Sequence, residues 1–229
     1  MKILERLPRE TGRDYALRVL KENIINLELA PGSLVSENEL SAMLGLSRTP
    51  VREALIELSK VKIVDIYPQK GSAVALIDYD IIEEARFMRN LLECAVVELV
   101  CEMATPQDIV MLKSNLEMQS FYIDSSFGDM MELDNQFHKM LFTIARKEQV
   151  FTLMNNIAIH FDRVRRMALY SVKPVKIVED HYSLLRAIEE KNPERARSIM
   201  EMHLRRYKID ETVIRENYEP SFFKTSLAN

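Results

Sequence analysis

One stretch of the sequence, SENELSAMLGLSRTPVREAL (residues 36–55), contains two helix starts separated by a single helix stop. Ser36 stands where it can cap a first short helix. Gly45 follows where a tight turn between helices needs a positive φ. Ser47 can cap a second helix, and Pro50 falls in its first turn, where the missing N–H costs little. The stretch therefore predicts two short helices joined by a tight turn.

The segments on either side extend this pattern. Residues 12–29 repeat apolar side chains at helical spacing, which predicts one more helix in front. Behind it, the β-prone runs KIVDIY (62–67) and SAVALI (72–77) flank PQKG and predict a hairpin with Gly71 at its tip. Three helices followed by a two-stranded wing form a winged helix-turn-helix pattern. Residues 1–77 are therefore expected to form a DNA-binding domain.

The rest of the chain, residues 78–229, is predicted to be all helical. The whole sequence has only five glycines and no tryptophan, and it is 47% hydrophobic, a composition that favours a mainly α fold with a sizeable core. Links between the predicted helices are short, so the helices should pack as an antiparallel bundle. The expected helices are 78–103, 106–124, 128–146, 148–170, 174–191 and 193–216. The final YEPSFFKTSLAN has no clear periodicity and is expected to be a tail or an arm that packs on a partner subunit.

Other features exclude several classes of protein. No apolar run approaches the roughly 18 residues of a membrane span, and MKILERLPRE lacks the apolar region of a secretory signal. Cys94 and Cys101 lie two helical turns apart, about 10 Å, which is too far for a disulfide. These features indicate a cytoplasmic protein with reduced thiols. The net charge is −4, but residues 1–75 carry 11 basic and 10 acidic side chains, leaving room for a local basic patch.

The second helix of the turn carries side chains suited to reading DNA. Arg48 and Arg52 are four residues apart on one face, and Ser47 and Thr49 lie beside them. Arginine can bond guanine edges or phosphate, and small hydroxyls reach the backbone. Lys70 at the wing tip could contact phosphate or the minor groove. The plainer alternative is an amphipathic helix with two solvated arginines.

Together, SENELSAMLGLSRTPVREALIEL and the later PQKGSAV resemble the N-terminal domain of GntR-superfamily bacterial transcription regulators. The helical remainder resembles the effector domain, called FCD, of the FadR-type branch. The resemblance implies that Arg48, Thr49 and Arg52 contact DNA and that Gly71 is the wing glycine. Asn38 departs from the family, which often has a DNA-contacting arginine there, so fewer phosphate contacts or a shifted operator preference would follow. SKVKIV also departs, because many members have a glycine before the wing.

Four side chains in the helical region could hold a metal ion. Asp134 and His138 are one helical turn apart, so they share a face. His181 and His203 lie eleven residues before and after Asn192, the expected turn between two helices, so an antiparallel hairpin brings them level. Three imidazoles and a carboxylate suit Zn²⁺, Ni²⁺, Co²⁺ or Mn²⁺. Taken singly, each histidine is more often a satisfied core or surface residue.

The resemblance agrees with this set and adds a ligand. Many FCD domains have D-x-x-x-H, then one histidine, then another about 22 residues later, and all four side chains match this pattern. In the family the ion commonly helps to hold a small carboxylate effector. An arginine of an R-x-x-L-E motif belongs to the same pocket in many members, and Arg89 in RNLLE matches it. The alternative for Arg89 is a salt bridge to Glu93, one turn away.

Two other polar features are not assigned to this site. His160 does not match the ligand pattern and is expected to be polar core or to line a cavity. Three arginines in the motif RVRR are expected to be solvated or at an interface: Arg163, Arg165 and Arg166.

The predicted function is a ligand-responsive, homodimeric DNA-binding regulator, a repressor and not an enzyme. A two-fold dimer fits a palindromic operator of double-stranded DNA, and the helical domain is the expected dimer surface. The alternative is a metal-dependent hydrolase built on the bundle, with the metal ion activating water. The sequence offers no additional general base in a matching motif, and a DNA-reading domain precedes the bundle.

Overall fold

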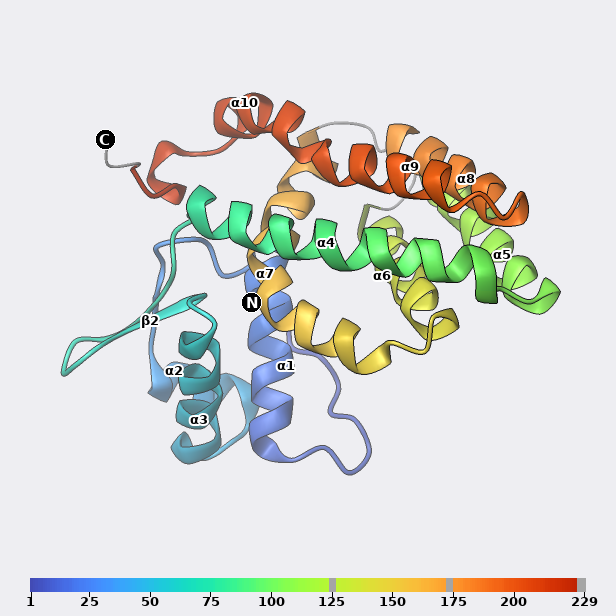
Figure 1. The fold of residues 1–229 in the computed structure, drawn as a ribbon. Helices are drawn as coiled ribbons and strands as arrows, with labels where there is room; N and C mark the ends of the chain where they lie inside the picture. The colour runs from blue at the N-terminus through green and yellow to red at the C-terminus, as the bar shows by residue number, and fades with distance from the viewer. Residues whose placement is uncertain (124–126, 172–174, 226–229) are drawn as a thin grey trace. The chain divides into compact units, whose positions relative to one another are not determined.

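The computed structural model describes residues 1–123, 127–171 and 175–225, which fold as two units (Figure 1). The first unit contains Met1–Ile81 and the segment that begins at Tyr218. The second unit is Ile82–Asn217. Helices dominate both, and the few strands belong to the first unit. The predicted fold class, a winged helix-turn-helix domain with an all-α bundle, is confirmed.

Three helices form the core of the first unit: α1 (Gly12–Ile25), α2 (Glu37–Leu44) and α3 (Arg48–Lys60). Both α1 and α2 pack against α3. Ser36 accepts a hydrogen bond from the Glu39 N–H at 3.5 Å, and Gly45 has φ of 63°, so the predicted cap and turn are confirmed. The helix predicted over 12–29 ends earlier, at Ile25.

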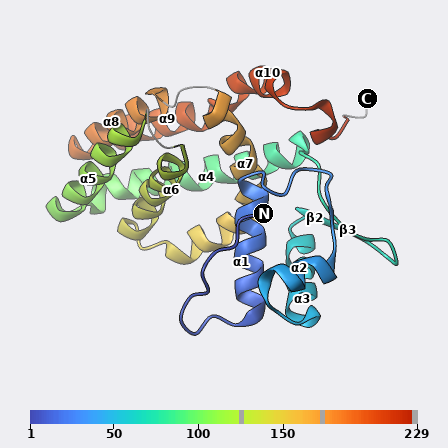
Figure 2. The ribbon, with the colours of Figure 1, turned by 180° about the vertical axis from the view of Figure 1, so that it is seen from behind.

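The wing is a sheet of three strands, one more than predicted. Strands β2 (Val64–Tyr67) and β3 (Gly71–Val74) form the expected hairpin, with Tyr67 opposite Gly71. Strand β1 (Leu34–Val35) pairs with the other edge of β3, giving the order β1-β3-β2. A two-residue strand carries no periodicity that a sequence reading could detect. The hairpin projects away from α2 and α3 (Figure 2).

The end of the chain returns to the first unit. Phe223 forms a parallel bridge with Ile77, through hydrogen bonds from Ile77 N–H to Phe222 O and from Lys224 N–H to Ile77 O, both 2.8 Å. The Lys224 ammonium contacts Asp78 Oδ2 at 2.7 Å. In the described residues, this segment therefore packs on its own chain just before α4, although the sequence had assigned it to the effector domain.

Seven α-helices of the described chain form the second unit. Within the second unit, α5 packs on α6 and α8, α7 packs on α6 and α10, and α8 packs on α9. Helix α9 lies beside α4, joined by a 3.0 Å ion pair between Arg197 and Glu98 (Figures 1 and 2). The helices are α4 (Tyr79–Met103), α5 (Pro106–Tyr122), α6 (Phe127–Ile144), α7 (Glu148–Ser171), α8 (Val175–Glu189), α9 (Pro193–Arg205) and α10 (Tyr207–Asn217).

The starts of these helices follow the sequence signals, but one predicted helix is two. Thr105 forms a full capping box with Asp108, and Asn192 Oδ1 accepts from the Arg195 N–H at 3.0 Å. The helix predicted over 193–216 breaks at Arg206, whose N–H bonds to His203 O three residues back. Neither glycine nor proline marks this position, so local sequence could not indicate the break.

The hydrophobic core of the second unit contains both cysteines. Cys94 and Cys101 are buried free thiols, as predicted. Burial raises the pKa of Cys94 to about 12 and that of Cys101 to about 11, so both stay protonated at neutral pH. None of the helices in the described part of the chain combines the length and apolar character that a bilayer crossing needs.

Candidate functional site

The start of α3 presents all four side chains predicted to read DNA. Ser47 occupies the N-cap, but its hydroxyl makes no capping bond. Arg48 and Arg52 have side chains 68% and 71% exposed, and Thr49 is also exposed. The opposite face of the helix is buried in the core through Val51, Ala54, Leu55 and Leu58. The helix is thus anchored on one face and leaves its arginines in solvent on the other.

An acidic residue that the sequence reading missed lies between the two arginines. Glu37, the first residue of α2, lies 3.5 Å from Arg48 and 3.9 Å from Arg52. Its carboxylate restrains both guanidinium groups and offsets part of their charge. The sequence did contain a clue to this contact. The tight turn predicted at Gly45 folds the start of α2, where Glu37 lies, back toward the start of α3.

The wing tip holds the other two predicted DNA-contacting residues. Lys70 is exposed, and its N–H donates to Tyr67 O at 3.0 Å. Gly71 has φ of 105°, a backbone conformation that side chains disfavour, although a Cβ there would meet nothing within 4 Å. The glycine is therefore required by the turn itself, not by a close neighbour.

The structure brings the four predicted metal ligands together. Asp134 and His138 come from α6, His181 from α8 and His203 from α9. One ligand atom from each lies within 4.8 Å of the others. Rings of His181 and His203 are 4.6 Å apart between centroids, so the predicted levelling of the α8–α9 hairpin is confirmed. Asp134, His138 and His181 are buried, and His203 is partly buried.

Each histidine of this cluster has an acceptor beside its Nδ1 atom. For His138 it is Glu93 Oε2 at 2.5 Å, for His181 Gln119 Oε1 at 2.9 Å, and for His203 Asp180 Oδ2 at 3.5 Å. Of the three contacts, the one at His181 has hydrogen-bond geometry, and those at His138 and His203 are close polar contacts. Partners of this kind orient an imidazole and leave Nε2 with a lone pair for a metal ion. None of the three was predicted as a partner of a histidine.

The Gln119 amide is itself oriented by its neighbours. Its Nε2 donates to Asn115 Oδ1 at 2.7 Å and lies 3.5 Å from Leu133 O, so its oxygen faces His181. His181 Nδ1 must then be the donor. Burial, reinforced by the nearby cationic groups, holds the pKa of His181 well below its usual value, and burial lowers that of His203 to about 4. Both imidazoles are neutral at pH 7, the form that binds metal.

The geometry fits a divalent metal ion. Asp134 Oδ1 is 3.7 Å from His181 Nε2, and Asp134 Oδ2 is 3.9 Å from His138 Nε2. Ligands bound at about 2.0–2.1 Å around one ion lie about 3–4 Å from each other. The Nε2 atoms of His138 and His181 are buried and have no hydrogen-bond partner among the described residues. A metal ion would satisfy both atoms.

Next to the cluster, Arg89 on α4 is a buried guanidinium, only 4% exposed. Its Nε donates to Glu93 Oε1 at 2.6 Å, so the alternative salt bridge does form. That is the only hydrogen bond the described residues give Arg89, whose guanidinium carbon also lies 4.9 Å from the centre of the Phe161 ring. Burial would raise the pKa of Glu93, but Arg89 and His138 outweigh it and hold that pKa far below its usual range.

The arginines of the RVRR motif are largely buried, so the expectation that they are solvated was wrong, while the alternative of a place at an interface stays a prediction. Arg163 is fully buried and Arg166 is 9% exposed. Arg165 contacts Asp134 Oδ2 and donates to Asn135 Oδ1 at 3.0 Å. The motif faces the bundle interior because α7 packs against α6. His160 is also buried, and it lies outside the metal cluster.

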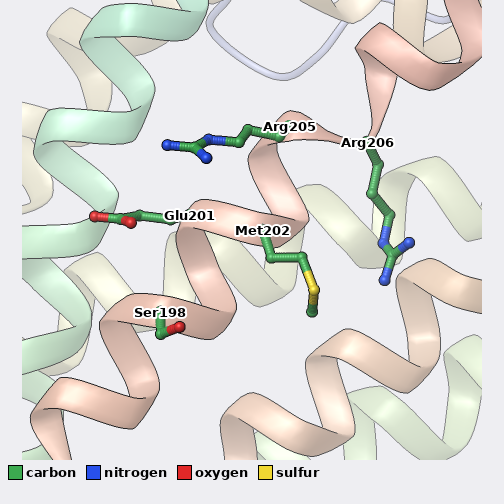
Figure 3. Close-up of a pocket in the computed structure, with 5 residues that line it drawn as sticks. All are labelled: Ser198, Glu201, Met202, Arg205 and Arg206. Atoms are coloured by element: carbon green, nitrogen blue, oxygen red, sulfur yellow. The ribbon is translucent and has the colours of Figure 1, made fainter.

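A surface depression on α9 is not part of this site. It is lined by Ser198, Glu201, Met202, Arg205 and Arg206. Figure 3 shows the two arginine side chains pointing away from each other, and Glu201 pointing toward α4. Arg206 pairs with both oxygens of Asp180. The lining groups do not converge on one ligand position.

Comparison with known families assigns both units. Residues 16–74 match the bacterial regulatory proteins of the gntR family, and residues 84–206 match the FCD domain. This chain belongs to the GntR family. It is a transcriptional regulator with a GntR helix-turn-helix domain followed by an FCD domain, as the sequence motifs predicted.

Relatives and solved structures agree with this assignment. The chain is 34% identical over 221 residues to an HTH-type transcriptional regulator of Streptomyces ambofaciens, covering 96% of this chain and 92% of that protein. It is 31% identical to the HTH-type transcriptional repressor RspR of Escherichia coli, covering 90% of each. The fold matches that of McbR/YncC from E. coli with a TM-score of 0.75 at 22% identity, over 91% of this chain and 99% of that one.

Proposed function

We propose that this GntR regulator is a cytoplasmic, metabolite-responsive repressor whose bundle binds a divalent metal ion and a small carboxylate. The observation that carries the proposal is the buried cluster of Asp134 and three histidines next to Arg89. A cation and a guanidinium at low dielectric form a trap for a carboxylate. Repression is proposed, and not activation, because the 31% identical relative is named a repressor.

The ligand set limits the ion without selecting one. Three imidazoles and one carboxylate suit Zn²⁺, Ni²⁺, Co²⁺ or Mn²⁺, and availability decides among them. When bound, the ion supplies a positive centre that can accept the oxygen of a carboxylate. The chain's own residues orient the ligands through Glu93, Gln119 and Asp180 and offer the amino groups of Arg89 to the same anion.

The DNA-reading side chains are proposed to bind a palindromic operator. Ser47, Arg48, Thr49 and Arg52 would enter the major groove, while Lys70 and Gly71 at the wing contact the neighbouring backbone. Effector binding changes operator affinity only if the ligand prefers one placement of the two DNA-binding domains of a dimer. Because a palindromic operator presents two matching half-sites, the proposed regulator is a homodimer, joined through its FCD domains.

An exposed apolar pair on α4 is the proposed dimer contact. Phe87 and Leu91 are one turn apart and 63% and 50% exposed. Substituting Phe87→Glu should convert a dimer of about twice 26.7 kDa into a monomer, measured by light scattering after size exclusion. Phe121→Glu on α5, at a side chain 72% exposed, is the matched control and should remain dimeric. A Phe87 variant that stays dimeric would refute this surface.

A gel-shift assay tests the function. The purified protein should retard a duplex that carries its own promoter region at low salt, and retardation should weaken as salt rises. The alternative, a metal-dependent hydrolase on the bundle, predicts the reverse. A protein that binds no duplex at low salt, yet hydrolyses esters or amides once metal is added, would rule out the regulator.

A further inference from the structure

Glu93 is a buried carboxylate on α4 that contacts two members of the candidate site at once. Its Oε1 accepts a hydrogen bond from Arg89 Nε at 2.6 Å, and its Oε2 lies 2.5 Å from His138 Nδ1. The side chains of all three are at most 4% exposed. One carboxylate thus joins the guanidinium proposed to hold the anion to an imidazole proposed to hold the metal ion.

These two contacts draw on the same negative charge. At low dielectric the competition is strong, so loosening one contact strengthens the other. The charge of Glu93 Oε2 lies 2.5 Å from His138 Nδ1 but outside hydrogen-bond geometry, so it acts on the imidazole electrostatically and makes the opposite nitrogen, Nε2, a better metal ligand. The other two outer partners are engaged elsewhere, Gln119 with Asn115 and Asp180 with Arg206. Among the described residues, Glu93 alone links a metal ligand to Arg89.

We infer that Glu93 is a positioning residue that couples metal binding to binding of the anionic effector, an inference that rests on the proposed function. An anion on the terminal amino groups of Arg89 loosens the guanidinium from Glu93. The negative charge of the carboxylate then acts more strongly on the His138 imidazole, and the metal ion binds more tightly. By reciprocity, the metal raises the affinity for the anion by the same factor.

A double-mutant cycle with Co²⁺ as the probe tests this coupling without knowledge of the effector. Glu93→Gln in the full-length protein should weaken Co²⁺ binding by about 10–100-fold, with one ion per chain still bound at saturation and a shifted visible spectrum. Arg89→Gln should change the Co²⁺ affinity because it releases Glu93. In the Glu93→Gln background that change should be at least about threefold smaller.

Three outcomes of the Co²⁺ measurements would contradict the proposed coupling through Glu93. Direct repulsion between guanidinium and metal would act in both backgrounds, so additive effects of the two substitutions would overturn the coupling. A wild type that binds Co²⁺ no better than Glu93→Gln, with the same spectrum, refutes only this inference. A wild type that binds no Co²⁺ defeats the proposed metal site as well.

Two controls separate position from stability. Glu98→Gln removes a carboxylate from the same helix, where it pairs with Arg197, and should leave Co²⁺ affinity and spectrum unchanged. If Glu93→Gln does not fold, the imidazole ¹⁵N resonances of the zinc-loaded protein provide the readout. Arg89→Gln should then move the resonances of His138 and not those of His181, and unmoved His138 resonances contradict the coupling.

Discussion

Purified protein carrying His181→Ala or His203→Ala should contain almost no divalent metal, while the wild type should contain close to one ion per chain. Each substitution removes one of four ligands whose donor atoms converge within 4.8 Å. Loss of an outer partner alone typically costs 10–100-fold in affinity, so loss of a ligand should cost more than about 100-fold. Elemental analysis by mass spectrometry measures the metal content directly.

A buried histidine outside the cluster is the matched control. His160 is 4% exposed, and His160→Ala removes the same side chain from the same unit. It should retain the full metal content. Circular dichroism before the analysis verifies that each variant is folded, and His181→Gln, which fills more of the vacated space, covers the case in which alanine is not tolerated. Folded His181 and His203 variants with wild-type metal content would refute the site.

The sequence predicted the DNA-reading unit well because its signals act locally. A capping serine, a glycine with positive φ and a proline in the first helical turn each determine backbone conformation within a few residues. Helix α3 therefore begins at the predicted residue, Arg48, and has both arginines on its exposed face. Strand β1 was missed because two residues carry no pattern and its partner, β3, is almost 40 positions away.

The candidate site was predictable only in part. His181 and His203 could be placed together because both are counted from one turn at Asn192, and a hairpin obeys simple geometry. Glu93 lies 45 positions before His138, and Gln119 lies 62 before His181, and no spacing rule relates helices that far apart. The burial of Arg163 and Arg166 likewise depends on how α7 packs, which helical periodicity alone does not reveal.

Substituting Arg48→Ala should weaken specific operator binding by about 1–3 kcal/mol, the contribution of one good base contact. Its side chain is 68% exposed, and its only described ion pair is a 3.5 Å contact with Glu37 that DNA can replace. The fold should be unaffected, since the apolar face of α3 is untouched. Fluorescence anisotropy with operator and with scrambled duplex measures both affinity and specificity.

The salt dependence of binding distinguishes a base contact from a phosphate contact. If Arg48 reads a base, the variant loses discrimination between operator and scrambled duplex while its salt slope stays nearly constant. If Arg48 contacts phosphate, both duplexes weaken together and the slope falls by about one unit. Lys60→Ala removes one positive charge from the other end of α3, where the lysine pairs with Glu57, and serves as the matched control. Because α3 should enter the groove by its N-terminal end, the Lys60 variant should bind like the wild type, and equal losses in both variants would contradict that orientation.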